Sequence, residues 1–184
     1  MRRTMKLENV LEEQGFTEYK LFDVSLIRID PAVRKLCEAN VCGSYGRNHM
    51  CPPSVDDIDQ WRDIIMGFEQ AVIVSKVYTM ENKYDMEVMF EGARDFEVSL
   101  RKARESIKEQ HSGVNMMILG AGPCMYCKKC SKLNDLPCVH PDKAYPSVEA
   151  CGIDVMSLSK DTGVKYNNGA NTVTYFGLVL YSSS

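Results

Sequence analysis

The chain has 184 residues, of which 45% are apolar and 26% charged, ordinary values for a soluble globular protein. This composition excludes a collagen-like or broadly disordered chain, and a formal net charge of −3 gives no basic field that would point to nucleic acid as a partner. The unusual feature is eight cysteines, about 4% of the residues, which is below the roughly 8–10% of a small disulfide scaffold. A chain of this length builds a core without disulfides, so the thiols need another explanation.

The start of the chain lacks the pattern of a targeting segment. Arg2 and Arg3 resemble the basic start of a signal peptide, but acidic residues follow them in place of an apolar run. No stretch approaches the roughly 20 apolar residues of a membrane span. We therefore expect a cytoplasmic protein without membrane insertion. Thiols stay reduced in the cytoplasm, where clustered cysteines bind metals or act in catalysis more often than they form disulfides.

Helical and strand patterns alternate along the chain. Apolar residues at helical spacing mark these stretches: 7–15, 31–37, 55–65, 86–107 and two short pieces separated by Gly152. Strands are predicted over four others: 16–29, 70–78, 114–120 and 172–181. Residues 40–53 hold glycines and prolines and are expected to form a rigid loop. The alternation predicts a compact α/β sheet with flanking helices, although the order of the strands does not follow from it.

Several side chains in the helical stretches have predicted local roles. Ser54 with Asp57 resembles the cap of one helix, and Asp154 that of another. Met86 is expected on the apolar face of the long helix, packed against the core. On the opposite face, Arg101, Lys102 and Arg104 are expected to be solvated.

Four cysteines lie within a segment crowded with Lys, Pro and Gly, residues 121–146. Cys124, Cys127, Cys130 and Cys138 have the spacing C-x2-C-x2-C-x7-C, and the first three resemble the bacterial ferredoxin run. Three thiolates spaced by two can each bind a different iron of one cuboidal cluster, and a fourth from farther along closes the site. Zinc is the main alternative, but it prefers two separated C-x2-C pairs. We therefore expect residues 121–146 to form a small ferredoxin-like lobe within a single metal-binding domain, 1–184.

A second group of cysteines lies in the glycine- and proline-rich loop. Cys37, Cys42 and Cys51 are spaced C-x4-C-x8-C, and the Pro after Cys51 resembles the Cys-Pro that follows the last ferredoxin ligand. The alternative is that these are buried or redox-active thiols, since cysteine is often a plain core residue. With a second cluster here, the prediction is two [4Fe–4S] clusters. Direct electron transfer between them requires the two segments to lie close together.

Seven cysteines are one short of two complete four-cysteine sites. Cys151 is the candidate for the eighth ligand, and a second arrangement exchanges Cys51 and Cys138 between the clusters. In a third, Cys37, Cys42 and Cys51 hold a cluster alone, which leaves one iron open to substrate. The first two describe an electron carrier and the third an enzyme. The sequence leaves all three open.

The sequence also resembles a known family over most of its length. The resemblance rests on motifs in the same order: Cys37 to Cys42, CGSYGRN running into Cys51-Pro52-Pro53, Gly122-Pro123-Cys124 with its C-x2-C-x2-C, Pro146 to Val155, and Phe176 to Leu180. These motifs resemble the domain of unknown function 2284 family of predicted metal-binding proteins. The resemblance implies iron–sulfur binding in mostly anaerobic microbes and no established reaction. Seven cysteines match the family's pattern; Cys151 falls where other residues also occur, and Tyr145 stands where an arginine is expected.

The functional expectation is an iron–sulfur protein that transfers electrons to a partner redox enzyme. The alternatives are an enzyme that uses an open iron held by Cys37, Cys42 and Cys51, and a zinc-stabilised binding module. His49 and His140 lie near cysteines, but a loop histidine bonded to the backbone is the simpler interpretation. Lysines around the cysteine run attract an acidic redox partner or compensate cluster charge. The catalytic residues, substrate and oligomeric state do not follow from the sequence.

Overall fold

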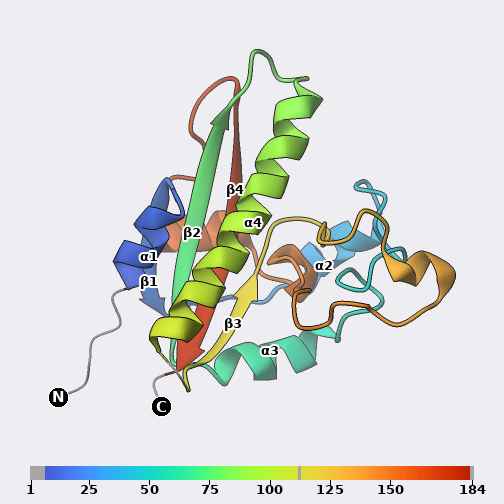
Figure 1. Ribbon diagram of the computed structural model, residues 1–184, viewed down its shortest axis with the longest axis horizontal. Coiled ribbons are helices and arrows are strands. Elements are labelled where there is room, and N and C mark those ends of the chain that lie inside the picture. Colours follow the sequence, from blue (N-terminus) through green and yellow to red (C-terminus); the bar gives the residue numbers. More distant parts are fainter. Residues whose placement is uncertain (1–6, 112, 183–184) are drawn as a thin grey trace.

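The computed structural model describes residues 7–111 and 113–182. Within this part, four strands form one antiparallel sheet: β1 (Glu18–Asp23), β2 (Gln70–Thr79), β3 (Asn115–Leu119) and β4 (Thr172–Ser182). Their order across the sheet is β1-β2-β4-β3, so the last strand along the chain lies between β2 and β3 (Figure 1). The α/β class predicted from the sequence is confirmed, and the strands are antiparallel.

Within residues 7–111 and 113–182, five α-helices accompany the sheet: α1 (Leu7–Glu13), α2 (Pro31–Glu38), α3 (Ile58–Met66), α4 (Met86–Gln110) and α5 (Val155–Thr162). Short 3-10 turns cover Val24–Leu26, Ser131–Asn134 and Glu149–Cys151. None of the helices in the described residues combines the length and the apolarity that a membrane span requires.

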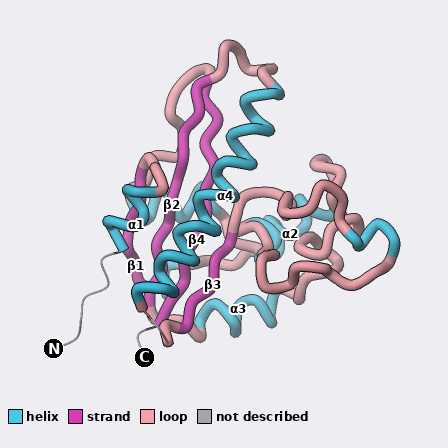
Figure 2. The backbone as a smooth tube through the Cα atoms, viewed as in Figure 1, coloured by secondary structure: helices cyan, strands magenta, loops and turns pink. Residues whose placement is uncertain are grey.

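The sheet is buried on both faces, which gives the molecule three layers. Val72 and Val74 of β2 belong to the core under α1 and α4, whereas Ile73 between them belongs to the core under α3 and α5. Because side chains alternate along a strand, a strand with apolar residues on both sides must lie between two helical layers. Figure 2 shows α4 running across the strands, with α2 and long loops extending to one side.

Two predicted boundaries shift by a few residues for local reasons. The strand predicted over 16–29 ends at Asp23, because the Asp23 side chain accepts a hydrogen bond from the Ser25 amide and starts a 3-10 turn. The third helix is capped by Asp57, not by Ser54. Asp57 and Gln60 form a reciprocal capping box, which satisfies two backbone donors at once.

The long helix α4 approaches the sheet closely in its middle and exposes Met86 at its start. A Cβ atom added at Gly92 would lie 2.9 Å from the ring of Tyr78, so a glycine is needed at this crossing. One turn and a half earlier, Met86 is 55% exposed. The expectation that Met86 packs on the core is therefore wrong. Tyr175 of β4 donates to the carbonyl of Met89 in the same turn, so this turn contacts the sheet without burying Met86.

The segment 121–146 leaves and rejoins the sheet at one point. The Gly120 amide donates to the carbonyl of Pro146 at 2.9 Å, and the Val148 amide donates to the carbonyl of Gly120 at 3.0 Å. These two hydrogen bonds close the base of the loop directly after β3. The cysteine-rich segment is thus attached to an edge strand of the sheet through a short, fixed base.

Candidate metal centre

The first cysteine group lies on α2 and the loop that follows it. Asp30 caps α2, and its side chain accepts from the Ala32 amide at 2.7 Å, as the Asp30-Pro31 pair predicts. Cys37 is half-buried in the last turn, whereas Cys42 is exposed. Between them the chain turns at Asn40, which has a left-handed backbone and whose side chain accepts from the Tyr45 amide at 3.0 Å. Local hydrogen bonds therefore shape this loop.

Cys51 is the buried member of the first group. Its thiol lies near thiols of both groups, since Cys37, Cys42, Cys124 and Cys130 all contribute to its electrostatic environment. Burial first, and the neighbouring thiols second, raise the pKa of Cys51 to about 12. A thiol with this pKa stays protonated at neutral pH, so a bound metal would have to displace its proton.

The second cysteine group winds around the 3-10 turn of residues 131–134. All four of its cysteines are half-buried. Asp135 has a left-handed backbone that ends this turn, and the Ser131 hydroxyl donates to the carbonyl of Pro137 at 2.7 Å. These contacts bring the chain back so that Cys138 lines the same cavity as Cys130.

Two consecutive side chains join the two cysteine loops. Asn48, which is 8% exposed, donates from Nδ2 to the carbonyl of Cys124 at 2.9 Å. His49 Nε2 lies 2.9 Å from the carbonyl oxygen of Leu136 and 3.2 Å from the hydroxyl of Ser131. The segments 37–53 and 121–146 are therefore neighbours, as electron transfer between two clusters requires. The contacts of His49 agree with the simpler interpretation of a histidine bonded to the backbone.

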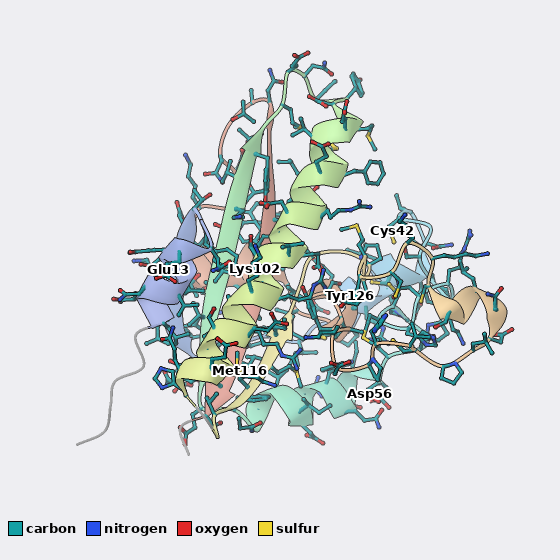
Figure 3. The ribbon with its side chains drawn as sticks, viewed as in Figure 1. Glu13, Cys42, Asp56, Lys102, Met116 and Tyr126 are labelled. Carbon is teal, nitrogen blue, oxygen red and sulfur yellow. The ribbon has the colours of Figure 1, made fainter. Side chains whose placement is uncertain are left out.

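One small cavity collects the second group together with residues of the first loop. Its lining includes Cys124, Cys127, Cys130, Cys138, His49 and His140. The ring of His140 packs edge-on against that of Tyr126, with 4.9 Å between their centres. Figure 3 shows Tyr126 and Cys42 in the part of the molecule that projects beside α4.

The donor set fits a group that binds several sulfur ligands. The cavity lining contains four thiols, and Cys51 lies near thiols of both groups. Soft thiolates are the ligands of iron–sulfur clusters and of zinc. Among the residues that the structure describes, no three His, Cys, Asp or Glu side chains converge on a point where one metal ion would bind. The thiols of a cuboidal cluster bind different irons, so they stand farther apart than the ligands of one ion.

Cys151 lies in a different environment from the other seven thiols. It is 0% exposed and packs in the core with Val148 and Ile153. Burial raises its pKa well above the ordinary value of a thiol. Cys37 is near enough to influence it, but Cys151 does not line the cavity of the second group.

A buried ionic network supports the base of the second cysteine loop. Glu97 of α4 is 2% exposed, and its Oε2 pairs with Nη1 of Arg101 at 3.3 Å. Burial raises the pKa of Glu97. Hydrogen bonds from Tyr145, Arg101 and the Ala121 amide lower it, but the effect of burial is larger. Arg101 also stacks over the rings of Tyr126 and Tyr145, 5.1 and 5.4 Å from their centres. These contacts connect α4 with the loop that carries Cys124.

The prediction that Arg101 lies on a solvated face of α4 is therefore wrong, because its side chain is only 11% exposed. Arg104, one turn later, donates to the carbonyl of Asp142 at 2.6 Å. The apolar pattern of α4 identified its sheet-facing side but did not reveal that its flank is covered by residues 121–146. Glu97 gave no signal in the sequence, because a glutamate within a charged helix is normally solvated.

The match to a protein family points to metal binding. The family described as "Predicted metal-binding protein (DUF2284)" matches residues 20–181. No match among curated proteins reaches significance. Among solved structures, an epoxyqueuosine reductase from Streptococcus thermophilus is similar at 7% sequence identity, with a TM-score of 0.48. That superposition covers 100% of this chain and 47% of the reductase chain, so this chain spans about half the length of that protein.

Proposed function

Because this chain belongs to the DUF2284 family of predicted metal-binding proteins, we propose that it is an iron–sulfur protein that carries two [4Fe–4S] clusters and passes electrons to a partner redox enzyme. The observation that carries this proposal is the meeting of the two cysteine groups. Asn48 and Cys124 are 76 positions apart in the sequence, yet the side chain of Asn48 donates a hydrogen bond to the backbone carbonyl of Cys124. Thiols of both groups lie near enough to Cys51 to raise its pKa.

The proposed ligands divide by segment. Cys124, Cys127, Cys130 and Cys138 would hold one cluster. Cys37, Cys42 and Cys51 would hold the other, and in a carrier its fourth iron would be closed by a ligand other than cysteine. When bound, such clusters accept and release single electrons. The protein's part is to keep the two ligand loops adjacent, which Asn48 and His49 do through contacts to the second loop.

The surface near these loops suits contact with another protein. Val41 and Val139, one in each loop, are 93% and 63% exposed. Lys128 and Lys129 are exposed beside the second cysteine run. Exposed apolar side chains with basic neighbours favour a partner that presents an acidic rim around an apolar centre.

Iron and acid-labile sulfide content after strictly anaerobic purification tests this proposal. We expect about eight irons and eight sulfides per chain, as two cubane clusters require, and a broad visible absorption. Cys127→Ala should lose about half of the iron and destabilise the second loop. The matched control Cys151→Ala should keep all of it. A colourless protein that contains zinc without sulfide would overturn the proposal and favour a zinc-stabilised binding module.

A second function is favoured by the thiol count of the first loop. This loop contributes only three thiols, one of which, Cys42, is exposed, and the remaining cysteine, Cys151, is buried in the core. A cluster held by three thiols keeps one iron open and acts as a Lewis acid or substrate site in an enzyme. Spectra of the loaded protein that shift on addition of a small thiol would favour this function. Unchanged spectra would argue against it.

A further inference from the structure

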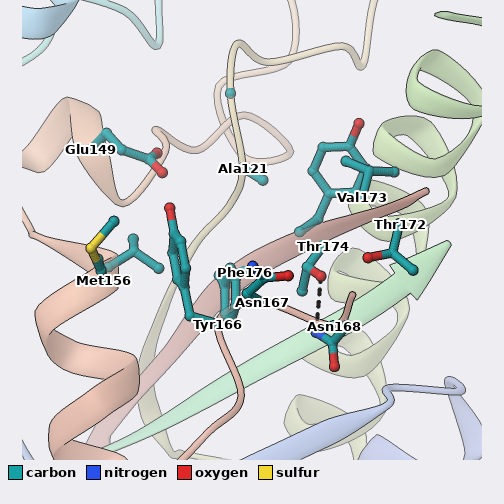
Figure 4. Close-up of a pocket in the computed structure, with 13 residues that line it drawn as sticks. Ala121, Glu149, Met156, Tyr166, Asn167, Asn168, Thr172, Val173, Thr174 and Phe176 are labelled. Atoms are coloured by element: carbon teal, nitrogen blue, oxygen red, sulfur yellow. Dashed lines mark hydrogen bonds between the residues drawn. The ribbon is translucent and has the colours of Figure 1, made fainter. Parts of the chain in front are cut away.

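A pocket that the cysteine loops do not use lies at the start of β4. It has a volume of about 660 Å³, within the range of small-molecule sites. One wall is formed by Glu149 and Tyr166, and another by the first residues of β4, including Thr174 (Figure 4). Ala121 and Gly122 border it as well, and Gly122 lies two residues before Cys124. The pocket thus lies beside the base of the second cysteine loop.

An aromatic surface lines this pocket and is open at its rim. The rings of Tyr166 and Phe176 stack at 5.4 Å with an angle of 10° between their planes. Phe176 is buried, but Tyr166 is 45% exposed, and Met156 on the same rim is 59% exposed. Large apolar side chains left open around a pocket are typical of a surface that a ligand covers. A flat ring placed on the outer side of Tyr166 would extend the existing stack.

The polar groups of the pocket select the charge of its ligand. Figure 4 shows the carboxylate of Glu149 directed toward the pocket. In the part of the chain that the structure describes, no Lys, Arg or His lines the pocket. Within the described residues Glu149 also takes part in no ion pair. Glu149 is an exposed residue, so its carboxylate is accessible to a ligand. An anionic ligand would meet a carboxylate without any compensating cation.

The opposite wall offers weaker, fixed hydrogen-bonding groups. Asn168 donates from Nδ2 to the hydroxyl of Thr174 at 3.0 Å, which holds the amide against β4. Asn167 accepts the Gly169 amide at 3.0 Å through its Oδ1. These contacts hold the loop of residues 166–168 in a defined shape. Pre-formed walls of this kind are typical of a ligand site.

We propose that this pocket binds a small planar nitrogen heterocycle whose ring stacks on Tyr166 and whose N–H edge, neutral or cationic, is bound by Glu149. Two parallel donors on one edge of a ring match the two oxygens of a carboxylate, as the donors of a guanidinium do. The inference goes beyond the proposed electron transfer and does not depend on the clusters. Its ligand would lie next to the chain segment that leads to Cys124.

The test measures binding of 2-aminobenzimidazole, a planar base with adjacent N–H donors, to the full purified chain by calorimetry. Benzimidazole-2-carboxylate, which has the same ring with an anionic edge, serves as the paired probe. We expect the amine to bind and the carboxylate to bind at least about tenfold more weakly. Absence of binding by the amine, or equal binding of the two probes, would overturn the proposal.

Variants separate the two contacts of the ligand. Tyr166→Ala and Glu149→Gln should each weaken binding of the amine by about tenfold or more. The matched controls Tyr84→Ala and Glu109→Gln alter exposed residues outside the pocket and should leave it unchanged. Met156→Lys offers a cation to Glu149 from the rim and should also reduce binding. Unchanged binding in all three pocket variants would refute the site.

Iron content distinguishes this proposal from that of the clusters. All three pocket variants should retain the iron of the unmodified chain, because neither Tyr166 nor Glu149 nor Met156 is a proposed ligand. A chain without iron that still binds the amine through Tyr166 and Glu149 would refute the cluster proposal and uphold the pocket.

Discussion

Asn48 donates a hydrogen bond from Nδ2 to the carbonyl oxygen of Cys124 at 2.9 Å. Its Oδ1 accepts the amide of Met50 at 2.9 Å, so both ends of a buried amide are satisfied. One end shapes the loop that carries Cys51, and the other fixes the first cysteine of the second loop. The two proposed ligand loops are thus positioned by a residue that is not itself a ligand.

Replacement of Asn48 should separate the loops. Asn48→Ala leaves the Cys124 carbonyl without its donor, which we expect to lower the free energy of unfolding by about 1–3 kcal/mol. Asn48→Asp keeps the acceptor for Met50 but replaces the donor with a carboxylate, so it should be at least as harmful. Thermal unfolding and iron retention on gel filtration measure the effect. Asn134→Ala, in an exposed position of the second loop, should resemble the unmodified chain in both.

Cys151→Ala tests whether the eighth cysteine is a ligand. We expect unchanged iron content and a loss of stability of about 1 kcal/mol, because the change removes one buried atom from an aliphatic core. Metal analysis and thermal unfolding measure the two effects separately. A loss of iron as large as in Cys127→Ala would make Cys151 a ligand and would remove the argument for an open iron.

Gly120→Ala should strain the base of the second cysteine loop. An added Cβ would clash with Oε1 of Glu97 and lie 2.5 Å from Cε2 of Tyr145. Both side chains belong to a buried network, so we expect a loss of about 1–3 kcal/mol from overpacking. Denaturant unfolding of the purified protein measures this loss. Gly67→Ala, where the nearest atom is the Ile64 carbonyl oxygen at 3.2 Å, should cost less; equal losses would contradict the clash.

The pKa of Cys51 predicts how the metal-free chain reacts with alkylating reagents. The thiolate is the form of cysteine that reacts. Because burial raises the pKa of Cys51 to about 12, only a very small fraction of this thiol is thiolate at pH 8, and its alkylation should be slow. That fraction should rise about tenfold per pH unit up to the pKa. Mass spectrometry after iodoacetamide treatment at pH 7, 8 and 9 should find exposed Cys42 modified first. Rapid, pH-independent modification of Cys51 would contradict this environment.

The sequence predicted the helices and strands well because their signals are local. Asp154 caps α5 where expected, and the apolar run predicted over 70–78 is the interior strand β2. The strand order is different in kind. It depends on which distant segments pair, and β4 reaches β2 only through contacts that no local pattern contains.

Among the site residues, the cysteines could be identified by spacing, whereas the residues that position them could not. Asn48 has no sequence signal, since its partner is a backbone carbonyl in another segment. Arg101 appeared to belong to a solvated face, and only the covering loop turns it into a buried member of an ionic network. Whether the seven thiols bind metal stays a prediction.

The central position of β4 has a consequence for assembly during synthesis. All eight cysteines precede β4 in the chain, so every thiol emerges from the ribosome before the strand that pairs with both β2 and β3. Until β4 is in place, β3 has no neighbour in the sheet, and the base of the second cysteine loop is held only by its own hydrogen bonds and by its contacts with α4. The nascent chain therefore presents all its thiols on an unfinished scaffold, and the sheet that supports them is complete only after the last strand joins it.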